Sequence, residues 1–352
     1  MSSFDNGTNV TETKYVLPVG VYISDTIFFS YGILFPVLAV FGYFGNILTA
    51  IVLWKKEKAS VNDILLRVLV LSDITLVTGG LLGLTLPVLL STVLVNGYLV
   101  NALELNISDY VMLTSQQFNV YILVLISVER YIAICHPLKC VNFRSRGKTI
   151  ALILGIVCFS IVYNIPLLLA YTDNPFTCVN MTSSFTCFKV LYTEFGKSYF
   201  FQEVYLTWLY GATYFVLPLT LLLGLNIFII KELAKTRKIR LNLGVVRSPK
   251  TKNDSITLSL VIIIAIFMVV QTLGVLPRFA QMFDWTVSIS FSVTINTLYL
   301  TNSCINIFIY VFVGKKFRKN VIEMFKKCFH CASICSTSSE HYQVSELHDL
   351  II

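Results

Sequence analysis

The sequence predicts an all-α fold, a seven-transmembrane helix bundle with a short amphipathic eighth helix on the inner leaflet. Of its 352 residues, 56% are hydrophobic and only 13% are charged, which is about half the charge of a typical soluble domain. Seven apolar stretches approach or exceed the ~20 residues that cross a bilayer as a helix, and they lack the alternation of a membrane barrel. These stretches are residues 27–54, 64–94, 110–134, 150–171, 200–230, 256–283 and 289–313.

Basic residues indicate the orientation of these spans. Lys55, Lys56 and Lys58 follow the first span, whereas only Lys14 precedes it. Because basic residues concentrate on the cytoplasmic side, we expect a plasma-membrane protein with its N-terminus outside and its C-terminus inside. The expected parts are an extracellular N-terminus (1–26), the seven-transmembrane domain (27–313), the amphipathic helix (314–328) and a cytoplasmic tail (329–352).

Short motifs on the expected outer side predict covalent modifications. Four Asn-x-Ser/Thr sequons predict glycans in the N-terminus and the first two outer loops. Their acceptor asparagines are Asn6, Asn9, Asn106 and Asn180. Cys178 and Cys187 lie in one outer loop on the oxidising side, so we expect them to bond to each other, which would contribute roughly 2–3 kcal/mol. The alternative is two free thiols.

An acidic and a basic residue stand together at the end of the third span. Glu129 and Arg130, followed by Tyr131, come after a long apolar run, and an ion pair at that depth is costly to hold. Such a pair suggests a switch, because the arginine can leave its neighbour for another partner. The alternative is an arginine that extends its head group toward the lipid surface.

A second group of polar residues lies within the spans. Asp73 stands in the middle of the second span among apolar residues, and a buried carboxylate there is expensive and tends to be functional. Amides and a hydroxyl of other spans could reach the same depth. They are Asn46, Asn119, Asn302, Ser303 and Asn306. Such an oxygen-rich set suits a sodium ion with water, or it forms a hydrogen-bonded knot that holds the helices together; the sequence leaves both alternatives open.

The order and spacing of these motifs resemble those of a rhodopsin-like G-protein-coupled receptor over about residues 27–330. The resemblance rests on motifs from six of the seven spans. They are Gly45-Asn46, Leu71-Ser72-Asp73, Glu129-Arg130-Tyr131, the prolines Pro218 and Pro277, and Asn306-Ile-Phe-Ile-Tyr310, in which Ile307 stands in place of the usual proline.

The sequence also departs from this family at particular positions. The family's helix-three cysteine, which bonds to the second outer loop, is replaced by Leu105, and its sixth-helix tryptophan is replaced by Val275. Met112 stands where amine receptors hold a ligand-pairing aspartate, and Leu300 stands where opsins attach retinal. The resemblance therefore implies neither an amine receptor nor a photoreceptor.

Two stretches, 128–139 and 302–318, are similar more narrowly to invertebrate receptors for FMRFamide-type neuropeptides. This resemblance implies an extracellular peptide ligand. Acidic residues outnumber basic ones on the expected outer side, which would attract a cationic peptide such as one of the amidated Arg-Phe type. Asp109 and Glu203 are candidate carboxylate partners, and Gln116 is a further candidate contact; the alternative for the acidic residues is a solvated rim.

The resemblance also implies partners on the inner side. A heterotrimeric G protein would bind near Arg130, with Tyr310 as part of the same switch. Residues 315–327 carry apolar side chains at four-residue spacing and predict an amphipathic helix on membrane lipid, followed by candidate palmitoylation sites at Cys328 and Cys331. A phosphorylated 336–340 segment would recruit an arrestin-like protein.

Other classes of function are less consistent with the sequence. We expect no enzyme, because no His-Glu-x-x-His pattern occurs and none of the four histidines lies in an expected span. No cofactor is expected apart from the sodium ion at Asp73, and no nucleic acid is an expected partner. The alternatives are a polytopic transporter or channel, although no internal repeat is seen, or a divergent receptor for a non-peptide ligand.

Overall fold

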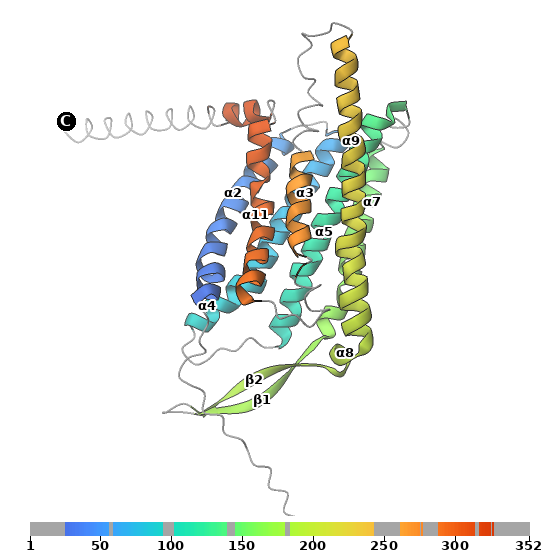
Figure 1. Ribbon diagram of the computed structural model, residues 1–352. Helices are drawn as coiled ribbons and strands as arrows, with labels where there is room; N and C mark the ends of the chain where they lie inside the picture. Colours follow the sequence, from blue (N-terminus) through green and yellow to red (C-terminus); the bar gives the residue numbers. More distant parts are fainter. Residues whose placement is uncertain are drawn as a thin grey trace, which may run out of the picture.

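The computed structural model is a bundle of long helices with a β-hairpin at one end (Figure 1). It describes residues 25–55, 59–93, 102–138, 145–179, 184–242, 261–274, 276, 288–313, 317–324 and 326. Within these residues, five helical segments are long and apolar enough to cross a membrane: Asp25–Trp54, Val61–Leu89, Asn106–Cys135, Arg146–Leu169 and Phe200–Thr236. A shorter apolar helix, Val261–Gly274, and α11 (Ile289–Val313) occupy the sixth and seventh expected spans. The predicted seven-helix bundle is confirmed.

The spans are built from the following elements. The first contains α1 (Asp25–Ile27), η1 (Phe28–Leu34) and α2 (Phe35–Trp54), and the second contains α3 (Val61–Gly80), η2 (Leu81–Thr85) and α4 (Leu86–Val93). The third is α5 (Ala102–Cys135), and the fourth contains α7 (Arg146–Tyr163) and η3 (Ile165–Leu169). The fifth contains η4 (Phe200–Leu209), η5 (Gly211–Val216) and α9 (Leu217–Asn242), and α8 (Glu194–Lys197) precedes it.

Four departures from α-helical geometry lie next to prolines within the spans, whereas the π segment η4 contains no proline. Proline lacks a backbone N–H and its ring collides with the carbonyl one turn earlier, so the chain there widens into π turns or tightens into a 3-10 turn. The π segments η1, η2 and η5 each end two residues before a proline, and the 3-10 segment η3 contains one. The prolines are Pro36, Pro87, Pro218 and Pro166, in that order. Pro277 lies outside the described residues.

The second span begins at a well-formed cap. The Ser60 hydroxyl accepts a hydrogen bond from the Asp63 backbone N–H, and the Asp63 carboxylate accepts one from the Ser60 N–H at 2.8 Å. These two bonds satisfy backbone donors that the first helical turn leaves without partners. They fix the start of α3 at Val61, and so the depth of Asp73 in the same helix.

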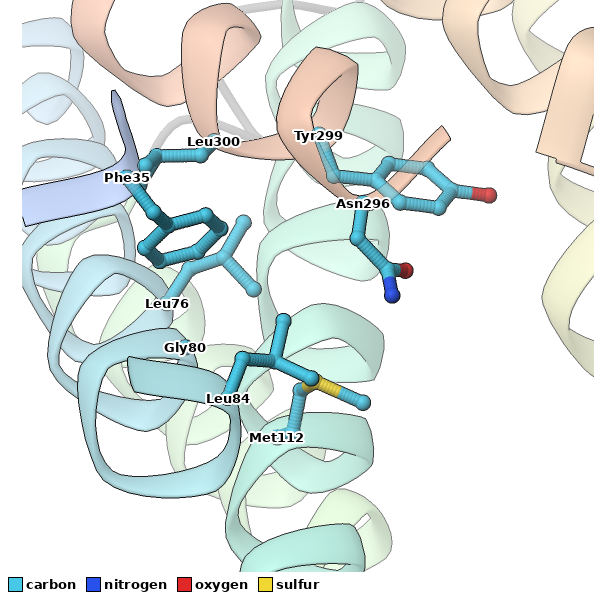
Figure 2. Close-up of a pocket in the computed structure, with 8 residues that line it drawn as sticks. All are labelled: Phe35, Leu76, Gly80, Leu84, Met112, Asn296, Tyr299 and Leu300. Carbon is cyan, nitrogen blue, oxygen red and sulfur yellow. The ribbon is translucent and has the colours of Figure 1, made fainter. Parts of the chain in front are cut away.

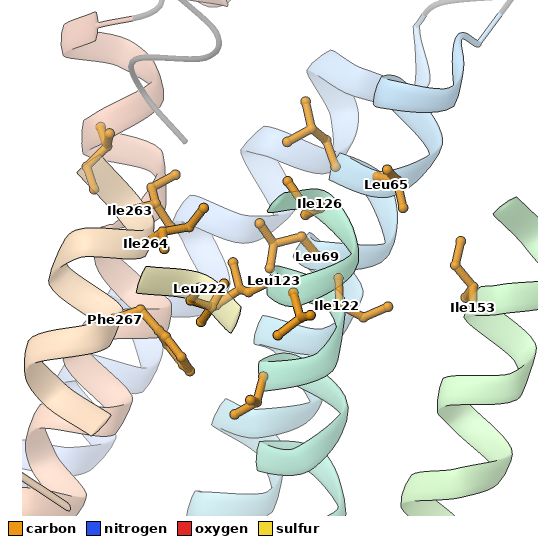
Figure 3. Packing of buried hydrophobic residues seen from close by; sticks show 14 of the residues in the cluster. Leu65, Leu69, Ile122, Leu123, Ile126, Ile153, Leu222, Ile263, Ile264 and Phe267 are labelled. Atoms are coloured by element: carbon orange, nitrogen blue, oxygen red, sulfur yellow. The ribbon is translucent and has the colours of Figure 1, made fainter. Parts of the chain in front are cut away.

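The largest apolar core lies between the second, third, fifth and sixth spans. Leu69 of α3, Leu123 of α5 and Leu222 of α9 pack with Ile264 and Phe267 of the sixth helix (Figure 3). By contrast, large apolar side chains such as Phe44 and Val162 are exposed on α2 and α7. Exposed apolar faces on helices of this length suit lipid rather than water, so the chain is a multi-pass membrane protein.

A two-stranded antiparallel hairpin is added to the predicted helices. Its strands are β1 (Tyr171–Val179) and β2 (Ser184–Tyr192), and they lie at the end of the bundle that carries α4 and α8, whereas α9 extends past the opposite end (Figure 1). Cys178 lies opposite Phe185, and Cys187 lies opposite Phe176. The two cysteines are thus diagonal neighbours across the hairpin, and the disulfide between them stays a prediction.

Candidate functional site: a buried polar centre and an ion pair

Asp73 is the centre of a polar cluster in the middle of the bundle. Its side chain is buried, with 1% of the residue exposed. Asn119 of α5 donates a hydrogen bond to Asp73 Oδ1 at 2.8 Å, and Asn306 of α11 donates one to Asp73 Oδ2 at 2.7 Å. A buried carboxylate is tolerated only when hydrogen bonds replace the lost water, so these amides hold α3, α5 and α11 together.

The first span joins the same cluster through an asparagine. Asn46 Nδ2 donates to the Gly42 carbonyl at 2.9 Å and to the Ser303 carbonyl of α11 at 3.2 Å. Asn302 is buried too, and its Oδ1 and that of Asn306 have no hydrogen-bond partner among the described residues. The structure therefore brings all six predicted polar residues to one buried region, where carboxylate and amide oxygens could accept a cation.

The ion pair near the C-terminal end of α5 is buried. Arg130 Nε lies 3.6 Å from Glu129 Oε2, and each residue is only 6% exposed. The burial excludes the alternative of an arginine extended into the lipid head groups. Tyr131 faces another way: its hydroxyl lies 3.1 Å from His136 Nε2, and its ring packs against Phe228 of α9. Tyr310 belongs to α11, but its side chain is outside the described part of the structure.

The three candidate ligand residues lie at different depths. Asp109 is partly buried on α5, and Glu203 is exposed on η4. Gln116 is buried two turns further into the bundle, where its Nε2 donates to Gln271 Oε1 at 3.5 Å. This hydrogen bond links α5 to the sixth helix, which makes Gln116 an interhelical contact as well as a candidate ligand contact.

A small cavity lies between α3, α5 and α11. It has about 20 Å³ open to water-sized molecules, room for about one water. Its lining is Phe35, Leu76, Gly80, Leu84, Met112, Asn296, Tyr299 and Leu300 (Figure 2). Met112 and Leu300, the positions at which amine receptors and opsins differ from this chain, thus line the same space. Asn296 also donates a hydrogen bond through its Nδ2 to the Tyr31 hydroxyl, at 2.8 Å.

A second polar network was missed by the sequence analysis. Asn164, next to η3, donates to Gln117 Oε1 of α5 at 2.8 Å, and the Tyr214 hydroxyl of η5 lies 3.0 Å from Asn164 Oδ1. All three residues are buried. The sequence shows these three residues as an asparagine, a glutamine and a tyrosine within or beside apolar spans. Each of them alone is common in membrane helices, so the sequence did not indicate that they form a network.

The structure places the acceptor asparagine of one predicted sequon, Asn106, in a buried position. Asn106 is 6% exposed, and its amide makes two hydrogen bonds with the backbone of Tyr171. An acceptor asparagine must be exposed to carry a bulky glycan, and this side chain is enclosed between α5 and β1. The other predicted modification sites, Asn6, Asn9, Asn180, Cys328 and Cys331, lie outside the described residues.

A membrane bundle that encloses a hydrogen-bonded carboxylate and holds a buried Glu-Arg pair at one helix end has the architecture of a seven-helix receptor. The family model described as "7 transmembrane receptor (rhodopsin family)" matches residues 45–310. The chain therefore belongs to the rhodopsin family of seven-transmembrane receptors, and it is a receptor rather than an enzyme.

Curated relatives are similar over most of the chain but at low identity. The FMRFamide receptor of Drosophila melanogaster is 26% identical over 300 residues, which cover 84% of this chain and 54% of that receptor. The chain thus spans about half the length of that relative. The neuropeptide Y receptor type 6 of Oryctolagus cuniculus is 26% identical over 90% of this chain and 85% of its own length. The somatostatin receptor type 1 of Rattus norvegicus is 27% identical over 82% and 69%.

Proposed function

We propose that this receptor lies in the plasma membrane with its N-terminus outside, binds an extracellular neuropeptide, and promotes guanine-nucleotide exchange on a heterotrimeric G protein. The observation that carries the proposal is the buried pair of Glu129 and Arg130, 3.6 Å apart at the inner end of α5. A buried ion pair is expensive to desolvate. Arg130 therefore has a partner at rest and becomes available to a G protein when the neighbouring helices move apart.

The contact between Gln116 and Gln271 offers a route from the ligand to that pair. Gln116 lies seven residues below Asp109 on α5, and its 3.5 Å bond reaches the sixth helix. A ligand that competes for this amide would weaken the link between the two helices. A ligand shifts a conformational equilibrium only through its different affinities for the two states, and this competition supplies such a difference.

The peptide class is supported by charge and by the named relatives. Those relatives are receptors for FMRFamide, neuropeptide Y and somatostatin by name. In this chain, Asp109 follows Asn106, which bonds to Tyr171 at the base of the hairpin, by three residues, and Glu203 lies on η4, which begins soon after the hairpin ends. An amidated Arg-Phe peptide has a guanidinium and no C-terminal carboxylate, so it would pair with them without like-charge repulsion.

A sodium ion at Asp73 would act as a modulator of this equilibrium. The Asp73 carboxylate and the Asn302 and Asn306 amide oxygens are the hard donors that such a cation accepts. Bound there, the ion would neutralise a buried charge and favour the arrangement in which α3, α5 and α11 stay joined.

Further partners act from the tail. Residues 317–324 are helical, with Val321 buried and Phe317 packed against the main core, so their polar side faces away from the bundle as expected of a helix on lipid. Palmitoyl chains on Cys328 and Cys331 would anchor this helix. A phosphorylated 336–340 segment would recruit an arrestin-like protein.

The test is nucleotide exchange in membranes that hold this chain and a G protein, with a panel of amidated peptides. We expect a saturable response that Arg130→Ala abolishes and Asp73→Asn alters in its sodium dependence. Arg146→Ala is the matched control, because Arg146 is an exposed arginine at the start of α7. A full response in Arg130→Ala would contradict the switch, and silence across the panel with normal surface expression would contradict the peptide class.

A further inference from the structure

The outer end of α5 is tied to the hairpin by one side chain. Asn106 Nδ2 donates a hydrogen bond to the Tyr171 carbonyl at 3.0 Å, and the Tyr171 N–H donates one to Asn106 Oδ1 at 3.1 Å. The same amide thus pairs with both backbone groups of one residue, as a neighbouring strand would. Two such bonds fix the position and the rotation of Tyr171 relative to α5, and their burial protects them from competition by water.

Tyr171 in turn controls the base of the hairpin. It is the first residue of β1 and lies opposite Tyr192, the last residue of β2, with ring centroids 5.0 Å apart. The next residue, Thr193, donates its N–H to the Ala170 carbonyl at 2.9 Å and its hydroxyl to the Leu169 carbonyl at 2.7 Å. Both strand ends are therefore joined beside η3, and the hairpin moves with Tyr171.

The position of this contact coincides with a departure from the family. Asn106 directly follows Leu105, which stands where the family has the cysteine that bonds to the second outer loop. We propose that Asn106 is the positioning residue of this loop: its paired hydrogen bonds with Tyr171 replace the missing disulfide, and it carries no glycan despite the Asn106-Ile107-Ser108 sequon.

A hydrogen-bonded link differs from a disulfide in two measurable ways. It opens spontaneously, because two hydrogen bonds hold far less tightly than a covalent bond, and it does not respond to reducing agents. Loss of the pair should therefore raise the rate at which the backbone around Tyr171 exchanges its amide hydrogens, by about fivefold for each typical net hydrogen-bond contribution that is lost.

The test is hydrogen–deuterium exchange on the full purified chain, followed over peptides that cover 170–179. Asn106→Leu removes both bonds. Asn106→Asp keeps the size but places an acceptor against the Tyr171 carbonyl. The matched control is Ser108→Ala, which destroys the sequon and leaves the Asn106 amide in place. We expect faster exchange in both Asn106 variants, unchanged exchange in Ser108→Ala, and the same electrophoretic mobility for Ser108→Ala and the parent chain before deglycosylation.

Two results would overturn the proposal. If Ser108→Ala migrates as a chain smaller by one glycan, Asn106 is glycosylated and the buried pairing is wrong. Asn106→Asp retains the volume of the residue, so it serves as the test if Asn106→Leu fails to fold. If hydrogen exchange over 170–179 is unchanged in Asn106→Asp, the contact does not position the hairpin. Neither readout involves a peptide or a G protein, so failure here is distinct from failure of the proposed function.

Discussion

The seventh and sixth helices are held in the bundle in different ways. Asn306 in α11 donates a short hydrogen bond to Asp73, and Ser303 in α11 accepts one from Asn46. The sixth helix packs through apolar side chains such as Ile264 and Phe267 (Figure 3), and its hydrogen bond to α5 is the longer one from Gln116. Directional bonds fix a register, whereas apolar contacts can form again after a shift. The sixth helix is therefore the one best suited to move.

The same contrast appears in the close packing between α2 and α11. A side-chain carbon added at Gly45 would lie 2.7 Å from Ile307 Cγ2, and one added at Gly42 would collide with Cys304 Sγ. Small residues let two membrane helices approach closely. The first, second, third and seventh spans thus form a fixed part of the receptor.

The largest effect on stability is expected at Asn164, which joins the fourth span to the third and fifth spans. Asn164→Leu takes the short hydrogen bond from the buried Gln117 Oε1 and leaves the Tyr214 hydroxyl with the Leu113 carbonyl as its near partner. The unsatisfied amide oxygen and the second lost bond should together lower the free energy of unfolding by about 2–4 kcal/mol. Ser160→Ala is the control, because the Ser160 hydroxyl bonds only within its own helix, to the Ile156 carbonyl. Thermal unfolding in detergent measures both, and equal Tm values would contradict a joining role for Asn164.

A smaller loss is expected from Gly45→Ala, which tests the close approach of α2 and α11. The added methyl group should cost about 1–3 kcal/mol through overpacking, and Ile307→Ala in the same chain should recover part of it. Gly155→Ala on α7 is the control, because a carbon added there meets no atom within 4 Å. If the two glycine variants unfold at the same temperature, the helices are not in close contact at Gly45.

The smallest effect on stability, but a clear effect on signalling, is expected at the movable helix. Gln116→Leu or Gln271→Leu removes one hydrogen bond, and the double variant replaces both partners. In each variant the free energy of unfolding should change by less than about 1 kcal/mol. Nucleotide exchange without ligand should rise about fivefold, because the link between α5 and the sixth helix is lost. Lower exchange without ligand in both single variants would show that the bond favours the active state instead.

The sequence predicted the seven spans because apolar stretches of membrane length are unambiguous in composition. Their ends were less accurate. The third span was expected from residue 110, but α5 begins at Ala102, since polar residues such as Glu104 and Asn106 lower the hydropathy while the helix continues beyond the bilayer. For the same reason α9 continues to Asn242 through basic residues, past the expected end at residue 230.

The two polar centres were predictable to different degrees. Asp73 was found because a carboxylate within an apolar span has few explanations other than a hydrogen-bonded or functional site. The network of Gln117, Asn164 and Tyr214 was missed because its members become partners only when three helices take their relative rotations. The burial of Asn106 was not foreseen because a three-residue sequon carries no information about burial.

The substitution of Ile307 for proline has a mechanical consequence. Ile307 keeps the backbone N–H that a proline would remove, and α11 continues as an α-helix over 25 residues, about 37 Å at 1.5 Å per residue. A helix without a hinge transmits a rotation rather than absorbing it in a bend. A force applied at Asn296, beside the cavity, would therefore reach Tyr310, near the other end of α11, without being absorbed in a bend.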